Sequence, residues 1–100
     1  METNKAINST KKVLRLPVKA KYFFQIRNNE KPEEFRLNNV YWQKRLIGKT
    51  FDEVVITLGY PGREDTDRMI VRPWRGYSIK TISHEHFGNE PVSVFAIVVN

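Results

Sequence analysis

The chain contains no cysteine, and none of its apolar runs approaches the length needed to cross a membrane. The first absence excludes disulfides, thiolate chemistry and cysteine-based zinc sites. The second argues against a membrane-spanning protein. The start of the chain has no apolar stretch of the signal-peptide kind, so we expect a cytoplasmic protein. A glycine-rich phosphate loop of the P-loop or dinucleotide-binding type is missing too.

The composition present is that of one basic globular domain. The 100 residues carry a formal charge of +6, and 40% of them are hydrophobic. We expect residues 1–12 to form a flexible arm and residues 13–100 to form the domain. A chain of this size has one modest core, so a binding cleft should lie at its edge or inside a small barrel. The charge favours an anionic partner, with nucleic acid first, although it also serves solubility.

Hydrophobic periodicity changes along the chain, from mixed helix and strand patterns to strand patterns after Phe51. Helices are predicted at 19–28 and 40–46. Segments with strand patterns are 13–18, 32–37, 53–58, 69–74, 77–83 and 92–99. We therefore predict an α+β fold, a small mixed β-barrel of five to six strands in one curved sheet with two short helices.

Turn and cap residues support these boundaries. Asn29 suits the end of the first helix, because asparagine tolerates the left-handed conformation. Asn38 or Asn39 can cap the second helix. Residues 59–68 hold two glycines and a proline and are predicted to form a hairpin loop, and Gly76 marks a tight turn or bulge.

The segment 32–37 concentrates alternating charge. In an extended chain Glu34 and Arg36 share one face, and Phe35 and Leu37 take the other. We expect the two apolar side chains to be buried, and the charged pair to line a polar cleft with Lys31 beside it. A Lys near a carboxylate can act as a general base or hold a phosphate, and Arg36 offers a planar fork for phosphate or a base edge. The alternative is a structural ion pair with a solvated Lys31.

The run from Asn29 to Arg36 resembles the Gly-x-Lys-x-x-Glu-x-Arg signature of the ASCH domain family, which shares the PUA-like β-barrel fold. The order of predicted elements agrees, and the stretches 55–60 and 73–77 resemble those of small bacterial and phage ASCH proteins. The similarity spans residues 13–99. Asn29 stands where the family usually has Gly, a change that a helix end tolerates.

The resemblance implies a cleft for RNA, a nucleotide or a modified base, lined by Lys31, Glu34 and Arg36. Some relatives are ribonucleases, and one branch resembles an acetylcytidine amidohydrolase that uses a Lys, a Thr and a distant Glu. In that branch the Thr stands at the position of Glu34, so this chain lacks its nucleophile. If the protein is an enzyme, Lys31 and Glu34 are its candidate catalytic residues.

Aromatic residues beside basic ones form a second candidate region. Trp42 precedes Lys44 and Arg45, and its helical spacing from Leu46 favours a place in the core. Trp74 lies between Arg72 and Arg75, where stacking on a base and packing in the core are equally good interpretations. The residues predicted to bind ligand or RNA are Lys31, Glu34, Arg36, Thr57, Tyr60, Arg72, Trp74 and Arg75.

His84 and His86 could share one face of a strand, but a catalytic zinc needs three protein ligands and the sequence places no third one. We therefore predict no metal and no cofactor, and a partly exposed histidine pair. The first functional hypothesis is an RNA- or nucleotide-binding domain. Two alternatives stay open: a metal-independent ribonuclease or hydrolase of modified nucleosides, and a phage-type module that binds a protein partner.

Overall fold

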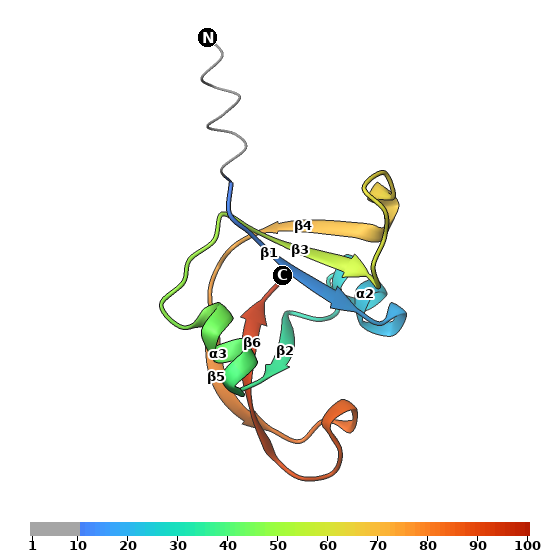
Figure 1. Ribbon diagram of the computed structural model, residues 1–100. Coiled ribbons are helices and arrows are strands. Elements are labelled where there is room, and N and C mark those ends of the chain that lie inside the picture. Colours follow the sequence, from blue (N-terminus) through green and yellow to red (C-terminus); the bar gives the residue numbers. More distant parts are fainter. Residues whose placement is uncertain (1–10) are drawn as a thin grey trace.

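The computed structural model describes residues 11–100, which fold as an α+β domain with six strands in two sheets and two α-helices (Figure 1). The elements in order are β1 (Val13–Val18), α2 (Ala20–Arg27), β2 (Glu33–Leu37), α3 (Val40–Leu46), β3 (Glu53–Leu58), β4 (Met69–Pro73), β5 (Tyr77–Ile82) and β6 (Val92–Val98). Two short 3-10 helices, η1 (Thr66–Arg68) and η2 (Glu85–Phe87), lie in loops. Each predicted helix and strand is present, with bounds within one residue of the prediction.

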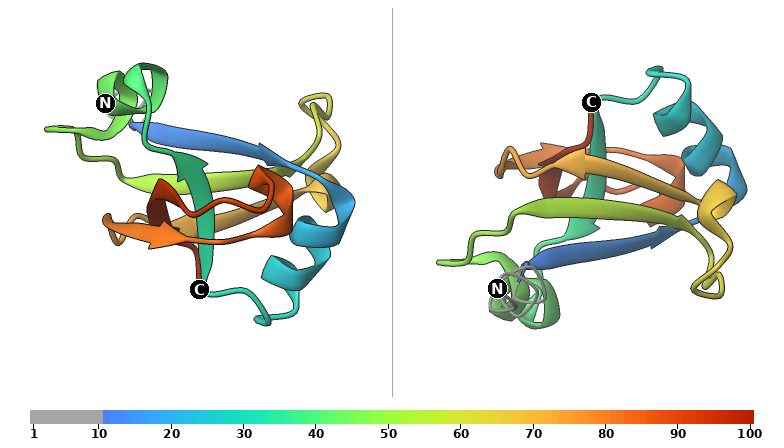
Figure 2. Two further views of the ribbon diagram at one scale, coloured as in Figure 1. Left: turned by 90° about the horizontal axis from the view of Figure 1, so that it is seen from below. Right: turned by 90° about the horizontal axis from the view of Figure 1, so that it is seen from above.

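The strands form two three-stranded sheets instead of the single curved sheet that we predicted. One sheet has the order β1-β3-β4 and the other the order β2-β6-β5. The β1–β3 pair is parallel, and the remaining pairs are antiparallel. In both views of Figure 2, β2 runs across the direction of β1 and β3. The hydrogen-bonded strand pairs of the described residues do not close into a barrel, so the barrel stays a prediction.

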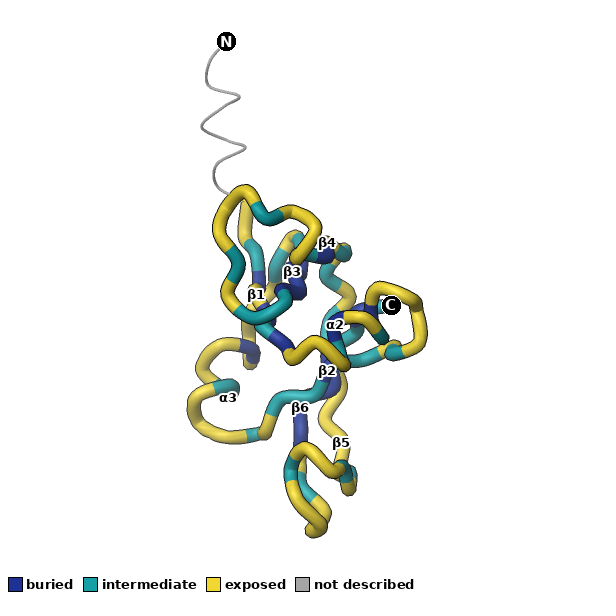
Figure 3. The backbone as a smooth tube through the Cα atoms, turned by 90° about the vertical axis from the view of Figure 1, so that its right-hand side faces the viewer, coloured by how far each residue is buried: buried dark blue, intermediate teal, exposed yellow. Residues whose placement is uncertain are grey.

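Each sheet is built around one nearly continuous apolar strand. Residues 54–57 of β3 and 94–97 of β6 are buried throughout, because each strand has a neighbour on both sides and protein on both faces. Helix α2 adds Phe23 and Ile26 from one face. Figure 3 shows these buried stretches on the strands and α2, and exposed stretches on most of the loops. In the described part of the chain, neither helix has the length or apolar character of a membrane-spanning segment.

Local signals position the segments around β2. Asn29 has a φ of 61°, so the chain turns through the left-handed region after α2, as predicted. The Asn39 side chain accepts a hydrogen bond of 3.0 Å from the backbone N–H of Trp42 and caps α3. Gly76, with a φ of 86°, lies where the chain passes from β4 in one sheet to β5 in the other.

At strand β2 the predicted burial of the two apolar side chains is wrong. Glu34 is buried with 5% exposure, whereas Leu37 is 38% exposed and Phe35 is half-buried. The alternation itself holds, since Glu34 and Arg36 lie on one side of the strand and form an ion pair. Their side faces inward because Arg36 donates a hydrogen bond of 2.8 Å to the carbonyl oxygen of Pro17 on β1. The charged face of β2 therefore meets the other sheet.

The predicted N-terminal arm is described only at its end. Residues 1–10 lie outside the described part of the chain. The backbone N–H of Lys12 donates to the Asp52 carboxylate at 2.8 Å, and the Lys11 ammonium lies 3.3 Å from a carboxylate oxygen of Glu53. These contacts place residues 11 and 12 beside the start of β3.

Candidate functional site

A cavity of about 450 Å³, here called the primary pocket, opens where the end of β1 meets α2, β2, η2 and the loop after β3. Its size is within the range of about 300–1,000 Å³ that is typical of small-molecule sites. The titratable side chains that line it are Lys19, Lys31, Glu34, Arg36, Arg68, His84 and His86. The aromatic side chains that line it are Tyr22, Phe35, Tyr60 and Phe87.

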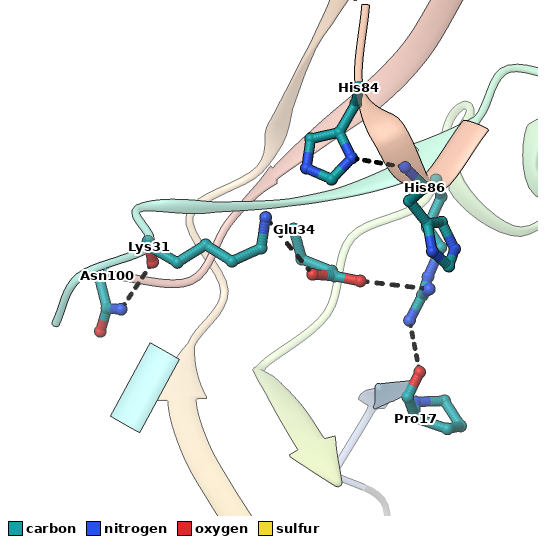
Figure 4. A network of polar contacts seen from close by, with 7 residues as sticks. Pro17, Lys31, Glu34, His84, His86 and Asn100 are labelled. Carbon is teal, nitrogen blue, oxygen red and sulfur yellow. Dashed lines mark hydrogen bonds and ion pairs between the residues drawn. The ribbon is translucent and has the colours of Figure 1, made fainter. Parts of the chain in front are cut away.

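Lys31, Glu34 and Arg36 form a charged triad at the wall of this pocket. One carboxylate oxygen of Glu34 lies 3.2 Å from Nη1 of Arg36, and the other lies 3.9 Å from Nζ of Lys31. Figure 4 shows the Glu34 carboxylate between the Lys31 ammonium and the guanidinium that bonds to Pro17. The side chains of Lys31, Glu34 and Arg36 are only 12%, 6% and 17% exposed. The three charges are therefore largely removed from water.

Arg36 makes three contacts with protein and has one unsatisfied donor. Its Nη2 bonds to the Pro17 carbonyl, its Nη1 faces Glu34, and its guanidinium carbon lies 5.3 Å from the centre of the Trp42 ring. Its Nε is buried and has no hydrogen-bond partner within residues 11–100. An unsatisfied buried donor is costly, and this nitrogen has almost no exposed surface, so it stays out of reach of a ligand in this conformation.

The Lys31 ammonium is held mainly by aromatic rings. It lies 4.5 Å from the centre of the Phe35 ring and 5.2 Å from that of Tyr22, both within cation–π range. Its position is fixed from the backbone, because the Asn100 side chain donates to the Lys31 carbonyl oxygen at 2.8 Å. Within the described residues Nζ makes no hydrogen bond to protein. Its three donors are therefore available to a ligand.

Burial shifts the pKa values of the triad. Burial lowers the pKa of Lys31, with Glu34 acting in the opposite direction. Burial likewise raises the pKa of Glu34 against the effect of Arg36, and it lowers that of Arg36, which stays protonated. Glu34 is the one carboxylate among the described residues lining the pocket. The pocket is therefore positive when all of its lysines, arginines and its carboxylate are ionised.

The histidine pair belongs to this pocket, which the sequence did not predict. The His84 Nδ1 accepts a hydrogen bond of 3.1 Å from the backbone N–H of His86. The centres of both imidazole rings lie within 6 Å of the centre of the Tyr22 ring. An ion pair of 2.8 Å between Lys21 and Glu85 joins η2 to α2. Burial and the nearby Lys19 charge lower the pKa of His86. No group of three possible metal ligands is found among residues 11–100.

Tyr60 and Thr57 fall in different environments, although the sequence placed both in the cleft. The Tyr60 side chain lines the primary pocket and is 91% exposed. Thr57 is buried, lies in the wall of an adjoining cavity instead of this pocket, and donates its hydroxyl hydrogen to the Gly59 carbonyl at 2.7 Å. Thr57 therefore shapes the turn that presents Tyr60.

The predicted basic and aromatic group at the end of β4 and just after it lies away from the primary pocket. Trp74 is half-buried, with its ring centre 4.9 Å from that of Phe51, because it covers the core between Phe51 and Tyr77. Arg75 is exposed and lines no part of the cavity. Arg72 donates from Nε to the Asn100 side-chain oxygen at 3.1 Å, so it supports the residue that fixes Lys31. Asn100 itself has no sequence signal that points to this role.

Comparison of the chain with family models, curated proteins and solved structures found no match. The likeness to the ASCH domain family therefore rests on the residues of the sequence, and the triad is interpreted from its own geometry.

Proposed function

We propose that this protein binds a nucleotide unit, free or within RNA, in the primary pocket. The observation that carries the proposal is the combination of unused cationic donors and aromatic rings in one cavity. The Lys31 ammonium has no hydrogen-bond partner within residues 11–100, and it suits phosphate oxygens together with the Arg36 guanidinium in the same wall. The rings of Tyr60 and Phe87 offer surfaces on which a base can stack.

Glu34 gives the pocket a means of selection. Its carboxylate accepts only, so it favours a base amino group or a ribose hydroxyl over a second phosphate. An anion in a cationic pocket also lowers the affinity for simple phosphate, which discriminates against ions that carry no base. The proposed division of roles is therefore phosphate on Lys31 and Arg36, and a donor group of the ligand on Glu34.

The resemblance to ASCH domains and to the PUA-like barrel agrees with this proposal and is part of it. The order of elements and the positions of Lys31, Glu34 and Arg36 on one wall support the likeness. An enzyme acting on the same ligand is the second candidate function. The observation that favours it is a lysine of lowered pKa beside a carboxylate of raised pKa in the wall of one pocket, a pairing suited to proton transfer.

Binding of nucleotides and short RNAs to Lys31→Ala tests the first proposal. Affinity should fall by about tenfold or more, because a charge-assisted hydrogen bond to phosphate is lost. The matched control is Lys49→Ala, which removes an exposed lysine outside the pocket. Thermal unfolding of both variants shows whether the fold is retained. Equal affinities in the two variants, or no nucleotide binding by the native chain, would reject the proposal.

The second candidate function, an enzyme, is tested by incubating the protein with RNA and with modified nucleosides and separating the products. Turnover that disappears in Lys31→Met, with ligand still bound, supports catalysis by the triad. Ligand that is bound and recovered unchanged supports a binding protein.

A further inference from the structure

A second cavity of about 900 Å³, here called the second groove, adjoins the primary pocket. The two cavities share Pro17, Arg36, Gly59 and Tyr60 in their walls. The shared walls make one continuous surface, on which Arg36 and Tyr60 stand at the junction. A ligand longer than one nucleotide unit can therefore extend from the primary pocket into the second groove.

The second groove is strongly cationic. Arg15 on β1, Arg45 on α3 and Arg63 in the loop after β3 line it together with Arg36, so four different elements supply guanidinium groups. The described residues that line it include no carboxylate. In the loop of Arg63, the Asp65 carboxylate accepts a hydrogen bond from the backbone N–H of Gly62 at 3.0 Å instead of facing the groove.

Among residues 11–100, these arginines form no ion pair. Within the described part of the chain, Arg15, Arg45 and Arg63 have no carboxylate within ion-pair distance. The Arg45 guanidinium lies 3.4 Å from the centre of the Tyr41 ring and donates to the Tyr41 carbonyl oxygen at 3.1 Å. Arg45 is exposed, and this is the one hydrogen bond of its side chain to the described residues. Several uncompensated guanidinium groups along one groove fit a series of phosphates.

Aromatic rings accompany the arginines. Tyr41, Trp42, Phe51 and Tyr60 line the second groove. Tyr60 is 91% exposed although it is a large aromatic residue at the junction of the two cavities. An exposed ring between two cationic cavities has the position of a stacking surface between successive nucleotides.

We infer that the ligand is a single-stranded nucleic acid that passes from the primary pocket over Tyr60 into the second groove. The inference rests on the proposed function and extends its ligand from one nucleotide unit to a strand. Arg36 contacts both parts of the strand, and Arg15, Arg45 and Arg63 hold the phosphates that follow. Unpaired bases are required because the rings bind base faces, which a duplex keeps stacked inside.

The test compares a nucleoside monophosphate with single-stranded oligonucleotides of about six nucleotides, a length within the usual site sizes. RNA and DNA of the same base sequence form two arms, since both carry the phosphates and bases that the groove recognises. The groove variant is Arg15→Gln with Arg63→Gln. The control variant, Arg75→Gln with Lys49→Gln, removes the same charge from positions outside both cavities.

The native chain should bind the oligonucleotide about tenfold or more tightly than the monophosphate. The groove variant should lose this advantage and keep the monophosphate affinity. In the groove variant, the negative slope of log affinity against log salt concentration should become shallower by about 0.7 for each phosphate contact removed. Tighter binding of RNA than of DNA assigns a ribose contact, and equal binding assigns recognition to phosphates and bases; both support the strand.

Equal losses in the groove and control variants would overturn the inference, as would equal affinity of the native chain for the two probe lengths. In either case Lys31-dependent binding of the monophosphate would leave the proposed function standing. Absence of Lys31-dependent binding to any probe would instead reject the proposed function itself. The two failures are therefore distinguishable in one set of titrations.

Discussion

The Nζ of Lys31 and the nearer carboxylate oxygen of Glu34 are 3.9 Å apart, which is too far for a hydrogen bond. The other oxygen of Glu34 lies 3.2 Å from Arg36. Glu34 is therefore paired more closely with one cation than with the other. The ammonium group of Lys31 is left beside the Tyr22 and Phe35 rings, where an acceptor on a ligand can complete its hydrogen bonds.

Glu34→Gln should separate stability from affinity. The substitution keeps the size of the side chain and removes the buried anion. Because burial of the carboxylate outweighs its attraction to Lys31 and Arg36 and raises the pKa of Glu34, the free energy of unfolding at neutral pH should stay the same or rise. Affinity for inorganic phosphate should rise because the anion is gone, while discrimination among bases should fall. Chemical denaturation and phosphate titration measure the two effects. A fall of about 3 kcal/mol in the free energy of unfolding would show instead that the carboxylate balances the two cations.

Replacing the whole triad should preserve stability. In a Lys31→Met, Glu34→Leu, Arg36→Met variant no buried charge is left, and apolar side chains of similar volume often match or exceed a buried ion pair. The free energy of unfolding should therefore equal or exceed that of the native chain, even though the Pro17 carbonyl loses its donor. Nucleotide binding should be abolished. A variant much less stable than Glu34→Gln would indicate that the triad is a structural element.

Stability should depend on pH through Glu34 with a definite sign. Its folded-state pKa is raised, so the folded chain binds more protons than the unfolded chain between the ordinary and the raised value. The contribution of Glu34 is most favourable below this window and is lost as pH rises through it. Lys31, whose pKa is lowered, contributes stability that returns as pH rises from its lowered value to its ordinary one.

Other carboxylates titrate in the acid range as well, so the measurement is a difference. The free energy of unfolding of the native chain minus that of Glu34→Gln should decrease as pH rises through the acid window. A difference that increases with pH there would mean that the pKa of Glu34 is depressed by its cationic neighbours.

Asn100→Ala should weaken ligand binding without touching the pocket wall. The Asn100 amide donates to the carbonyl oxygens of Ile26 and Lys31 at 2.9 and 2.8 Å and accepts from Arg72. Losing these bonds should cost about 2 kcal/mol of unfolding free energy and loosen the segment that carries Lys31. Arg72→Ala should act in the same direction more weakly, and Arg75→Ala should have no effect. Titration with a nucleotide distinguishes the three variants.

Phe95 and Phe35 should contribute differently to stability and to ligand affinity. Phe95 is fully buried, so Phe95→Ala should cost about 3–5 kcal/mol of unfolding free energy. Phe35 is half-buried and lies against the Lys31 ammonium, so Phe35→Ala should cost about 1–2 kcal/mol and reduce ligand affinity. Denaturation and titration of both variants check this. A loss of more than about 2 kcal/mol for Phe35→Ala would show that Phe35 is a core residue.

The helices and strands were predictable because their signals are local. The apolar runs of β3 and β6, the asparagine cap of α3 and the left-handed Asn29 all act within a few residues. The partition into two sheets was not predictable in this way. It depends on which distant strand completes each ladder, and alternation along one strand carries no information on its partner.

The same distinction applies to the site. Lys31, Glu34 and Arg36 lie close in sequence, so the period of a strand was enough to group them. The expectation that Leu37 would be buried followed the general preference of apolar residues for the interior, which β2 reverses because its charged face meets Pro17. The histidines of η2 and the arginines of the second groove come from separate elements, and only the fold brings them together.

The pairing of β2 with β6 has a consequence for how the protein folds. Glu33 lies opposite Val98, so two segments 65 residues apart in sequence must meet before β2 gains its only strand partner among the described residues. Closing so long a loop is slow, and Glu34 and Arg36 are not brought face to face with β1 until it is done. Ligand binding during refolding should therefore appear late, after the signal for helix formation. The rate at which binding appears should equal the rate at which β6 pairs with β2.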